Sequence, residues 1–488
     1  MAAVRNALRP NTSGKVIRTM WLFSWVQLAG IACSVVRTKL VALWIGTLGI
    51  GLFGLFNTAL DSITTLTQLG IRQSPVRNIA AARGEHALYR IVTAVRRWSW
   101  LLGIVGAFLT LVFSPLLSQL TFGSCDHTVG FIILSAAVML SSVTNGELAV
   151  MQGLDRLNRL ARATVWGALG GLAVSVPLFY FLGEASIVWS ILGYFVCQAV
   201  AVYLLHDRHD LMKRPAGVTL TSRELLAEGK DFVALGVYMT LSVFIAMAVN
   251  YLFMAYLNHE AGIDEVGQYQ AGYTIVNKYL GLIFTAIGFE FFPRISKVQA
   301  SVRRVSTFVS HEIMVALLVI LPGAAIMMTL DDVIVRLLYS SEFLPSAGYV
   351  NTALAGTAFR AVSWCMAYTL LARGDGKVYL LTESASGIAF LILSYFGYRL
   401  GGLDGLGVAY SIWYALYTVI VGIVYFGLYG MRLNRRVVLL TVIVVTLTVG
   451  CAAASICGVR FIPAAVAVVS SAVAFKILKS MICDARKR

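Results

Sequence analysis

Long apolar stretches separated by short polar segments repeat along the whole chain. A helix crosses the hydrocarbon core of a bilayer with about 20 apolar residues, and most of the stretches reach that length. They are continuous rather than alternating, which favours helices over a transmembrane barrel. The pattern therefore predicts an all-α polytopic membrane protein with about fourteen transmembrane helices. We expect them near residues 20–46, 49–71, 92–118, 128–151, 163–182, 185–205, 231–257, 266–292, 310–330, 347–371, 378–398, 405–430, 437–457 and 461–479.

The composition agrees with a chain whose solvent is mostly lipid. Of the 488 residues, 59% are hydrophobic and only 13% are charged, whereas a soluble domain carries roughly 25% charged residues. None of the seven cysteines has the spacing of metal ligands, so the sequence predicts neither a metal site nor a disulfide framework. The loops on the outer side are too short to hold catalytic machinery, so we expect a transporter rather than an enzyme.

The net charge of +16 follows from the orientation in the membrane. With a cytoplasmic N-terminus, 32 of the 39 Lys and Arg residues lie in cytoplasmic segments, three lie on the opposite side and four lie inside spans. The positive-inside rule predicts this asymmetry, and one misplaced span would invert every later loop. We therefore expect an even number of spans, both termini in the cytoplasm and no nucleic-acid partner.

Two segments resemble each other and indicate an internal repeat. Residues 51–77 and 267–295 are 216 residues apart, carry a polar stripe in mid-helix and end in Pro followed closely by Arg. Parallel repeats of this kind occur in transporters. We expect an N-terminal lobe of six spans at 1–205, a cytoplasmic linker at 206–230, a C-terminal lobe of six spans at 231–430, and two further spans with a basic tail at 431–488.

Four basic residues lie inside the predicted spans. A centred Lys or Arg costs roughly 2.5–3.5 kcal/mol on insertion scales, so such residues face a wet cavity or have partners. Lys278 and Arg360, in spans eight and ten, are the strongest candidates. Arg37 and Lys39 in span one are about 200° apart around a helix, and Arg37, on the side of Ser34, is the better cavity candidate. These residues predict a cavity that binds an anion such as a phosphate or diphosphate.

Acidic residues inside the spans are fewer. Asp61, in mid-span two, could pair with Arg37 or bind a coupling proton or sodium ion. Glu147 and Glu290 lie near cytoplasmic ends of their spans, where they are candidates for ion coupling or for pairing with an interfacial Arg or Lys. Three neutral side chains that share helix faces with these charges are predicted to line the cavity: Asn57, Gln68 and Asn277.

The chain resembles the multidrug/oligosaccharidyl-lipid/polysaccharide exporter superfamily, and within it the polysaccharide transporter branch of O-antigen or Wzx-type flippases. The resemblance lies in helix order, glycines and charges, and it is carried by residues 34–71, 74–84 and 266–297. It implies two six-helix lobes in a V around a cavity that opens alternately to each side. It also implies transport of undecaprenyl-diphosphate-linked oligosaccharide from the cytoplasmic to the periplasmic leaflet of the bacterial inner membrane.

The resemblance further implies the partners of the chain. These are a polyprenyl-diphosphate-linked oligosaccharide, membrane lipids and other polysaccharide assembly proteins, with no cofactor. Two alternatives stay open. Lipid II flippases carry an Arg near the position of Arg37, although the Asp that often follows it is here Thr38. Cation-coupled multidrug antiporters of the superfamily need an acidic site in the first lobe, for which only Asp61 could serve. The sequence does not name the sugar.

Overall fold

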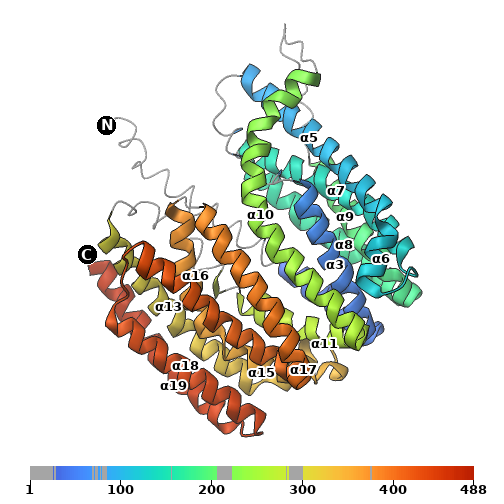
Figure 1. Ribbon diagram of the computed structural model, residues 1–488. Coiled ribbons are helices and arrows are strands. Elements are labelled where there is room, and N and C mark those ends of the chain that lie inside the picture. The colour runs from blue at the N-terminus through green and yellow to red at the C-terminus, as the bar shows by residue number, and fades with distance from the viewer. Residues whose placement is uncertain are drawn as a thin grey trace. The chain divides into compact units, whose positions relative to one another are not determined.

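The computed structural model describes residues 26, 29–68, 71, 75–76, 79, 85–154, 156–205, 222–281, 283–284, 301–373 and 376–487. All regular structure within these ranges is helical. The chain divides into two compact units, Met1–Gly262 and Ile263–Arg488. In Figure 1 the first unit runs from blue to green and the second from yellow-green to red.

The first unit begins with two helices that a sharp break separates. The helix of residues 29–44 ends before Gly46, whose φ of 78° lies in the left-handed region that glycine adopts at no steric cost. This break lies where the sequence predicts the division between the first two spans. The helices that follow are α3 (Gly46–Gln68), α5 (Glu85–Val112), α6 (Ser114–Phe122), α7 (Thr128–Gly153), α8 (Leu157–Leu182), the short η1 (Gly183–Ala185), α9 (Ser186–Leu204) and α10 (Ser222–Ala261).

Helix α10 packs within the first unit, against α3, α5 and α6 (Figure 1). The side-chain amide of Asn258 on α10 donates a hydrogen bond to the carbonyl of Thr121 on α6, at 2.8 Å. The structure groups this helix with the first compact unit, and the division into lobes at 206–230 stays a prediction. The hydropathy of the sequence predicts this span, but it does not predict which other helices the span packs against.

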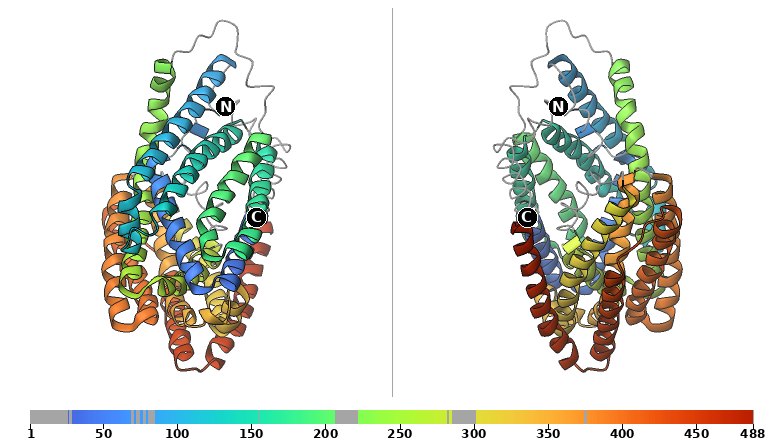
Figure 2. Two further views of the ribbon diagram at one scale, coloured as in Figure 1. Left: turned by 90° about the vertical axis from the view of Figure 1, so that its right-hand side faces the viewer. Right: turned by 90° about the vertical axis from the view of Figure 1, so that its left-hand side faces the viewer.

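The second unit is built around α13. Ile313, Leu317 and Ile320 are fully buried on one face of this helix, which contacts α16, α18 and α19. In Figure 2 the last two helices form the red pair at one edge of the unit. The helices of this unit are α11 (Ile263–Thr274), the π-helical turn η2 (Ile275–Tyr279), α13 (Val302–Thr329), α14 (Asp331–Leu338), η3 (Ser341–Phe343), α15 (Ser346–Leu354), α16 (Thr357–Arg373), α17 (Gly376–Gly422), η4 (Ile423–Leu428), α18 (Arg435–Ile456) and α19 (Phe461–Lys487).

Six helical stretches in the described part of the chain are long and apolar enough to cross a membrane. They are His86–Val112, Thr128–Gly153, Leu157–Leu204, Val302–Thr329, Lys377–Leu428 and Arg435–Ile456. The third and fifth contain 48 and 52 residues, respectively, far more than the about 20 that one crossing needs. The chain is therefore a multi-pass membrane protein, and the total of fourteen spans stays a prediction.

Helix α17 is a hairpin of two antiparallel arms. Its backbone leaves the helical region at Gly401 and Gly402, where Gly402 has a φ of 57°. On either side of this turn the backbones of Gly397 and Gly405 approach so closely that a Cβ on Gly397 would lie 2.6 Å from the Gly405 carbonyl oxygen. The two arms match the predicted spans at 378–398 and 405–430.

Candidate functional site

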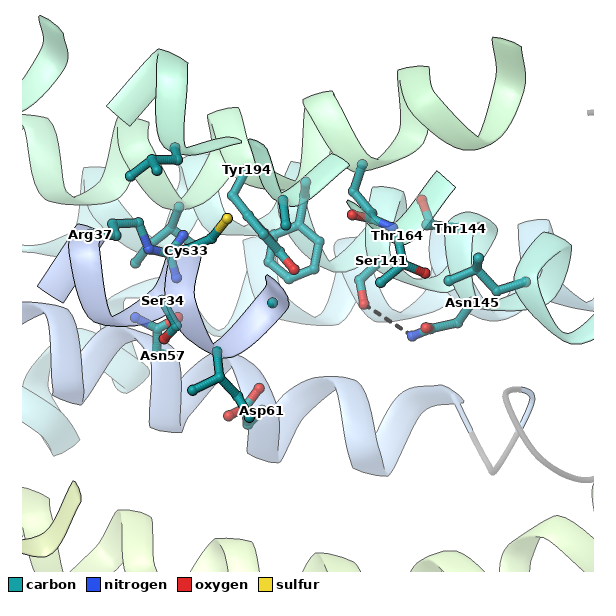
Figure 3. A pocket seen from close by; sticks show the side chains of 18 of the residues that line it. Cys33, Ser34, Arg37, Asn57, Asp61, Ser141, Thr144, Asn145, Thr164 and Tyr194 are labelled. Atoms are coloured by element: carbon teal, nitrogen blue, oxygen red, sulfur yellow. Dashed lines mark hydrogen bonds between the residues drawn. The ribbon is translucent and has the colours of Figure 1, made fainter. Parts of the chain in front are cut away.

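A cavity of about 550 Å³ lies within the first unit, between the helix of residues 29–44 and helices α3, α7, α8 and α9 (Figure 3). Each helix lines the cavity with residues three, four, seven or eight positions apart, so each contributes one face. Twelve of the twenty lining residues, counting Cys33 and Tyr194, carry polar side chains. Drug-binding pockets are lined mainly by apolar side chains, so this cavity suits a polar ligand.

Glycines on α8 bring α9 close to the cavity. A Cβ on Gly167 would lie 2.9 Å from the Cα of Gln198, and a Cβ on Gly171 would lie 3.1 Å from the Cα of Tyr194. The two glycines are four residues apart, a spacing of small residues that lets transmembrane helices pack closely. The close approach sets the positions of Tyr194 and Gln198, which both line the cavity.

A larger side chain at Gly171 is expected to move α9 and misplace Tyr194. Gly171→Val should destabilise the protein by about 1–3 kcal/mol, as overpacking of a tight interface does, and should lower transport. Thermal unfolding in detergent measures the first effect. Gly450→Val on α18 is the matched control, because a Cβ there meets nothing within 4 Å. An unchanged melting temperature for Gly171→Val would contradict the close packing of α8 and α9.

Arg37 is held at the cavity by two aromatic rings. Its Cζ lies 4.9 Å from the ring centroid of Phe53 on α3 and 4.9 Å from that of Tyr194 on α9. Such cation–π contacts contribute about 0.5–2 kcal/mol each. Within the described ranges no hydrogen bond or ion pair engages the guanidinium, so its five N–H donors are unpaired. A cation that lies over two aromatic rings and keeps its N–H donors unpaired is well suited to an anion.

The rest of the cavity wall mixes polar and apolar side chains and carries one further ionisable group, the carboxyl group of Asp61. Figure 3 shows Arg37 at one end, Thr144 and Asn145 at the other, and Asp61 between them. The Thr144 Oγ1 and Gln198 Oε1 atoms are buried without a hydrogen-bond partner in the part of the chain that the structure describes, although both residues line the cavity.

Gln68 lies behind this wall and joins α3 to α7. Its Nε2 donates to Ser141 Oγ at 3.0 Å, and its Oε1 accepts from Asn145 Nδ2 at 2.9 Å. Gln68 is itself buried and does not line the cavity, whereas Ser141 and Asn145 do. The predicted polar residue thus orients two side chains of the wall.

The structure separates the two basic residues of the first predicted span. Arg37, Asn57 and Asp61 all line the cavity, whereas Lys39 does not and its side chain is partly exposed. Salt bridges among the described residues do not include one between Arg37 and Asp61. The expected pairing of Asp61 with Arg37 is therefore not seen among these contacts, and ion coupling at Asp61 stays a prediction.

Glu147 forms a bidentate salt bridge with Arg96 on α5. Arg96 Nε lies 2.7 Å from Glu147 Oε1, and Arg96 Nη2 lies 3.2 Å from Glu147 Oε2. Bidentate charge-assisted hydrogen bonds are among the stronger ones in proteins. Of the two roles expected for Glu147, this contact favours charge pairing between α5 and α7.

In the second unit, Arg360 on α16 is the centre of a polar cluster. Its Nη1 donates to Asn277 Oδ1 at 2.9 Å and to the Tyr410 hydroxyl at 3.1 Å, and that hydroxyl donates to the same Asn277 oxygen at 3.0 Å. The guanidinium also lies over the rings of Phe284 and Tyr414, with Cζ–centroid distances of 4.8 and 5.6 Å. In the described structure the remaining Nε and Nη2 donors of Arg360 and the buried Asn277 Nδ2 have no hydrogen-bond partner.

Lys278 follows Asn277 in the π-helical turn η2, and its side chain is exposed. It does not belong to the hydrogen-bonded group of Arg360, Asn277 and Tyr410. Turns of this kind inside α-helices are frequent at functional sites. Glu290, the remaining predicted acidic residue, lies outside the described residues.

Sequence reasoning missed the tyrosines beside both guanidinium groups and a carboxyl group in the second unit. Tyr194 and Tyr410 are 216 residues apart, which is the offset of the repeated segments, and this spacing could have signalled them. Glu383 on α17 accepts a short hydrogen bond from the Tyr417 hydroxyl. It lies inside the predicted span at 378–398 and belongs with the other intramembrane acids.

Comparison with known proteins places the chain in a family. A family profile described as "Polysaccharide biosynthesis protein" matches residues 50–348, a range that includes Asp61 and Lys278 but neither Arg37 nor Arg360. The "Putative O-antigen transporter" of Shigella flexneri is 22% identical over 372 residues, which are 74% of this chain and 86% of that protein.

Solved structures show the same fold at low sequence identity. The lipid II flippase MurJ, in an inward closed conformation, is similar with a TM-score of 0.71 and 12% identity, over 95% of this chain and 99% of that one. An inward-facing multidrug resistance transporter of the MATE family, in the MOP superfamily, has a TM-score of 0.67 and 17% identity, over 83% of this chain and 94% of that one. Because the family profile spans more than half of the chain, this protein belongs to the polysaccharide biosynthesis protein family.

Proposed function

We propose that this protein is a flippase for a lipid-linked polysaccharide precursor of the bacterial inner membrane. The substrate is an undecaprenyl-diphosphate-linked oligosaccharide, as for O-antigen, which passes from the cytoplasmic to the periplasmic leaflet by alternating access. The family supports the polysaccharide part of this proposal, and the name of the Shigella relative supports transport. The observation that supports it most is the position of Arg37. Its guanidinium lines an intramembrane cavity and has N–H donors without partners among the described residues.

The chemistry of the head group fits this arrangement. A guanidinium donates two parallel hydrogen bonds to a phosphate, and the geometry is fixed if the plane of the group is fixed. Phe53 and Tyr194 hold the guanidinium of Arg37 in position, while Asn277 and Tyr410 hold Nη1 of Arg360. The diphosphate binds these two residues in turn while the polyprenyl tail stays in lipid.

The remaining predicted site residues have supporting roles in this proposal. Lys278 and Lys39 attract the anionic head group, and Asp61 is the candidate for a coupling proton or sodium ion. With an inside-negative potential, outward movement of the anion is favoured by roughly 2.3 kcal/mol per charge per 100 mV. With the N-terminus and C-terminus in the cytoplasm, the basic loops face the side on which the substrate is made.

Loss of the protein in its host tests the function. Cells without it are expected to lose surface polysaccharide and to accumulate lipid-linked oligosaccharide that an external glycosidase cannot reach in spheroplasts. A plasmid copy should restore both. Accumulation of lipid II with normal surface polysaccharide would contradict the proposal and favour a lipid II flippase instead.

A further inference from the structure

The cavity of the first unit has a second end that the proposed contact with phosphate does not use. We call it the amide end and define it by four lining residues. Thr144, Asn145 and Thr164 lie away from Arg37 in Figure 3, and Gln198 lies against Gly167 on α8, one helical turn after Tyr194 in the sequence. These side chains come from α7, α8 and α9 and carry hydroxyl and amide groups without formal charge. Amides and hydroxyls both donate and accept hydrogen bonds, so they match a ligand that does the same.

Two oxygen atoms at the amide end are buried without partners. Thr144 is 4% exposed and Gln198 is 6% exposed, and neither Thr144 Oγ1 nor Gln198 Oε1 has a hydrogen-bond partner in the described part of the molecule. Buried polar atoms are rarely left unpaired. Because both residues line the cavity, a hydroxylated ligand that enters it can supply the missing hydrogen bonds once these side chains turn toward it.

The placement of charge along the cavity favours a neutral group at this end. Asp61 lies on the wall between Arg37 and the amide end (Figure 3). A phosphate beyond Arg37 would approach this carboxylate and be repelled. A neutral hydroxyl group would instead donate a hydrogen bond to it. The order of charges therefore favours an anion at Arg37 followed by a neutral, hydroxylated group.

Aromatic residues on α9 complete the match to a sugar. Tyr194 and Phe195 both line the cavity, and their rings are arranged edge to face with centroids 5.3 Å apart. Aromatic rings provide rigid apolar surface against which the C–H face of a pyranose can pack. Hydroxyl and amide partners together with aromatic rings are what a single sugar unit needs.

We propose that the amide end binds the sugar next to the diphosphate, so that the first unit alone selects the sugar. Arg37 holds the phosphate, Asp61 and Gln198 bind hydroxyl or N-acetyl groups, and Thr144 adds a further hydrogen bond. This inference rests on the proposed function, because it takes the ligand to be a lipid-linked oligosaccharide. It makes Gln198 and Thr144 specificity-determining residues.

Cys33 provides a reporter for the test, because it lines the cavity one helical turn before Arg37. In a variant whose other six cysteines are replaced, the rate at which N-ethylmaleimide modifies Cys33 is measured in detergent with increasing probe. The two probes are geranyl diphosphate and the same molecule bearing one N-acetylhexosamine on its diphosphate. We expect the sugar-bearing probe to protect Cys33 at a concentration about ten-fold lower than the sugar-free one.

Variants assign the difference to the two ends of the cavity. Gln198→Leu and Thr144→Val should each reduce the advantage of the sugar by about three- to ten-fold, the effect of one hydrogen bond, without changing protection by geranyl diphosphate. Arg37→Gln should weaken protection of Cys33 by both probes to the same extent. Thr144→Ser, which keeps the hydroxyl, should behave as the unsubstituted protein. Ser190→Ala on α9 and Ser135→Ala on α7 are controls, since both residues are buried but do not line the cavity.

Equal protection by the two probes would overturn the inference, as would a loss of protection by both probes in Gln198→Leu or Thr144→Val. The proposed function fails in a different way. In that case the sugar advantage persists in the binding assay while cells without the protein keep normal surface polysaccharide.

Discussion

Arg37→Gln is expected to abolish transport while leaving the protein folded. Glutamine keeps a polar but shorter side chain, and it removes the charge and the guanidinium donors that Phe53 and Tyr194 hold in place. Losing one partner of a buried charge pair costs about 2–5 kcal/mol, so the transport rate at limiting substrate should fall at least about 30-fold. The assay is flipping of a fluorescent lipid-linked oligosaccharide in proteoliposomes.

Two further variants separate charge from geometry at this position. Arg37→Lys keeps the charge but loses the flat surface that stacks on both rings, so it should restore activity only in part. Lys39→Gln is the comparison variant, because Lys39 is in the same helix but does not line the cavity, so its loss should lower transport less than Arg37→Gln does. If Lys39→Gln were the more damaging change, the assignment of the anion site to the cavity would be wrong.

Arg360→Gln is expected to have an effect of similar size in the second unit. Asn277→Leu should also lower transport, by its effect on Arg360. It removes the Asn277 oxygen that accepts hydrogen bonds from Arg360 Nη1 and from the Tyr410 hydroxyl. A hydrogen bond to a charged group contributes about 1.5–3 kcal/mol, so this variant should lower transport roughly ten-fold or more. Flipping in proteoliposomes again measures both.

The control for the second unit is Arg399→Gln. Arg399 also lies over a tyrosine ring, with its Cζ 5.1 Å from the centroid of Tyr395, but it is predicted to lie at the outer end of its span. The Arg399→Gln variant should transport the substrate at the unsubstituted rate. The combination of Arg360→Gln with Asn277→Leu should be no worse than Arg360→Gln alone, since Asn277 acts through the guanidinium. Additive losses would show that Asn277 has a separate function.

Hydropathy and charge predicted much of this molecule because lipid constrains them strongly. The division of the first two spans at Gly46 and the hairpin of α17 both follow from apolar runs that glycines interrupt. Arg37 could be predicted as well, because a charge in an apolar span needs a cavity or a partner. Its separation from Lys39 follows from helical periodicity alone.

Contacts between distant helices could not be predicted in the same way. The tyrosines beside Arg37 and Arg360 lie more than 150 and about 50 residues away in the sequence, and nothing local marks them. The close approach of α8 and α9 depends on glycines such as Gly171, whose effect appears only when the partner helix is known. The grouping of α10 with the first unit rests on similar contacts.

The most direct measurement compares three substrates in proteoliposomes that contain the purified protein. We expect a short-chain polyprenyl-diphosphate oligosaccharide to be flipped, lipid II to be flipped poorly and a lipophilic cation such as ethidium not to be moved. Arg37→Gln should remove the first activity. Transport of ethidium that persists in Arg37→Gln and is lost in Asp61→Asn would contradict the proposed function and identify a cation-coupled exporter.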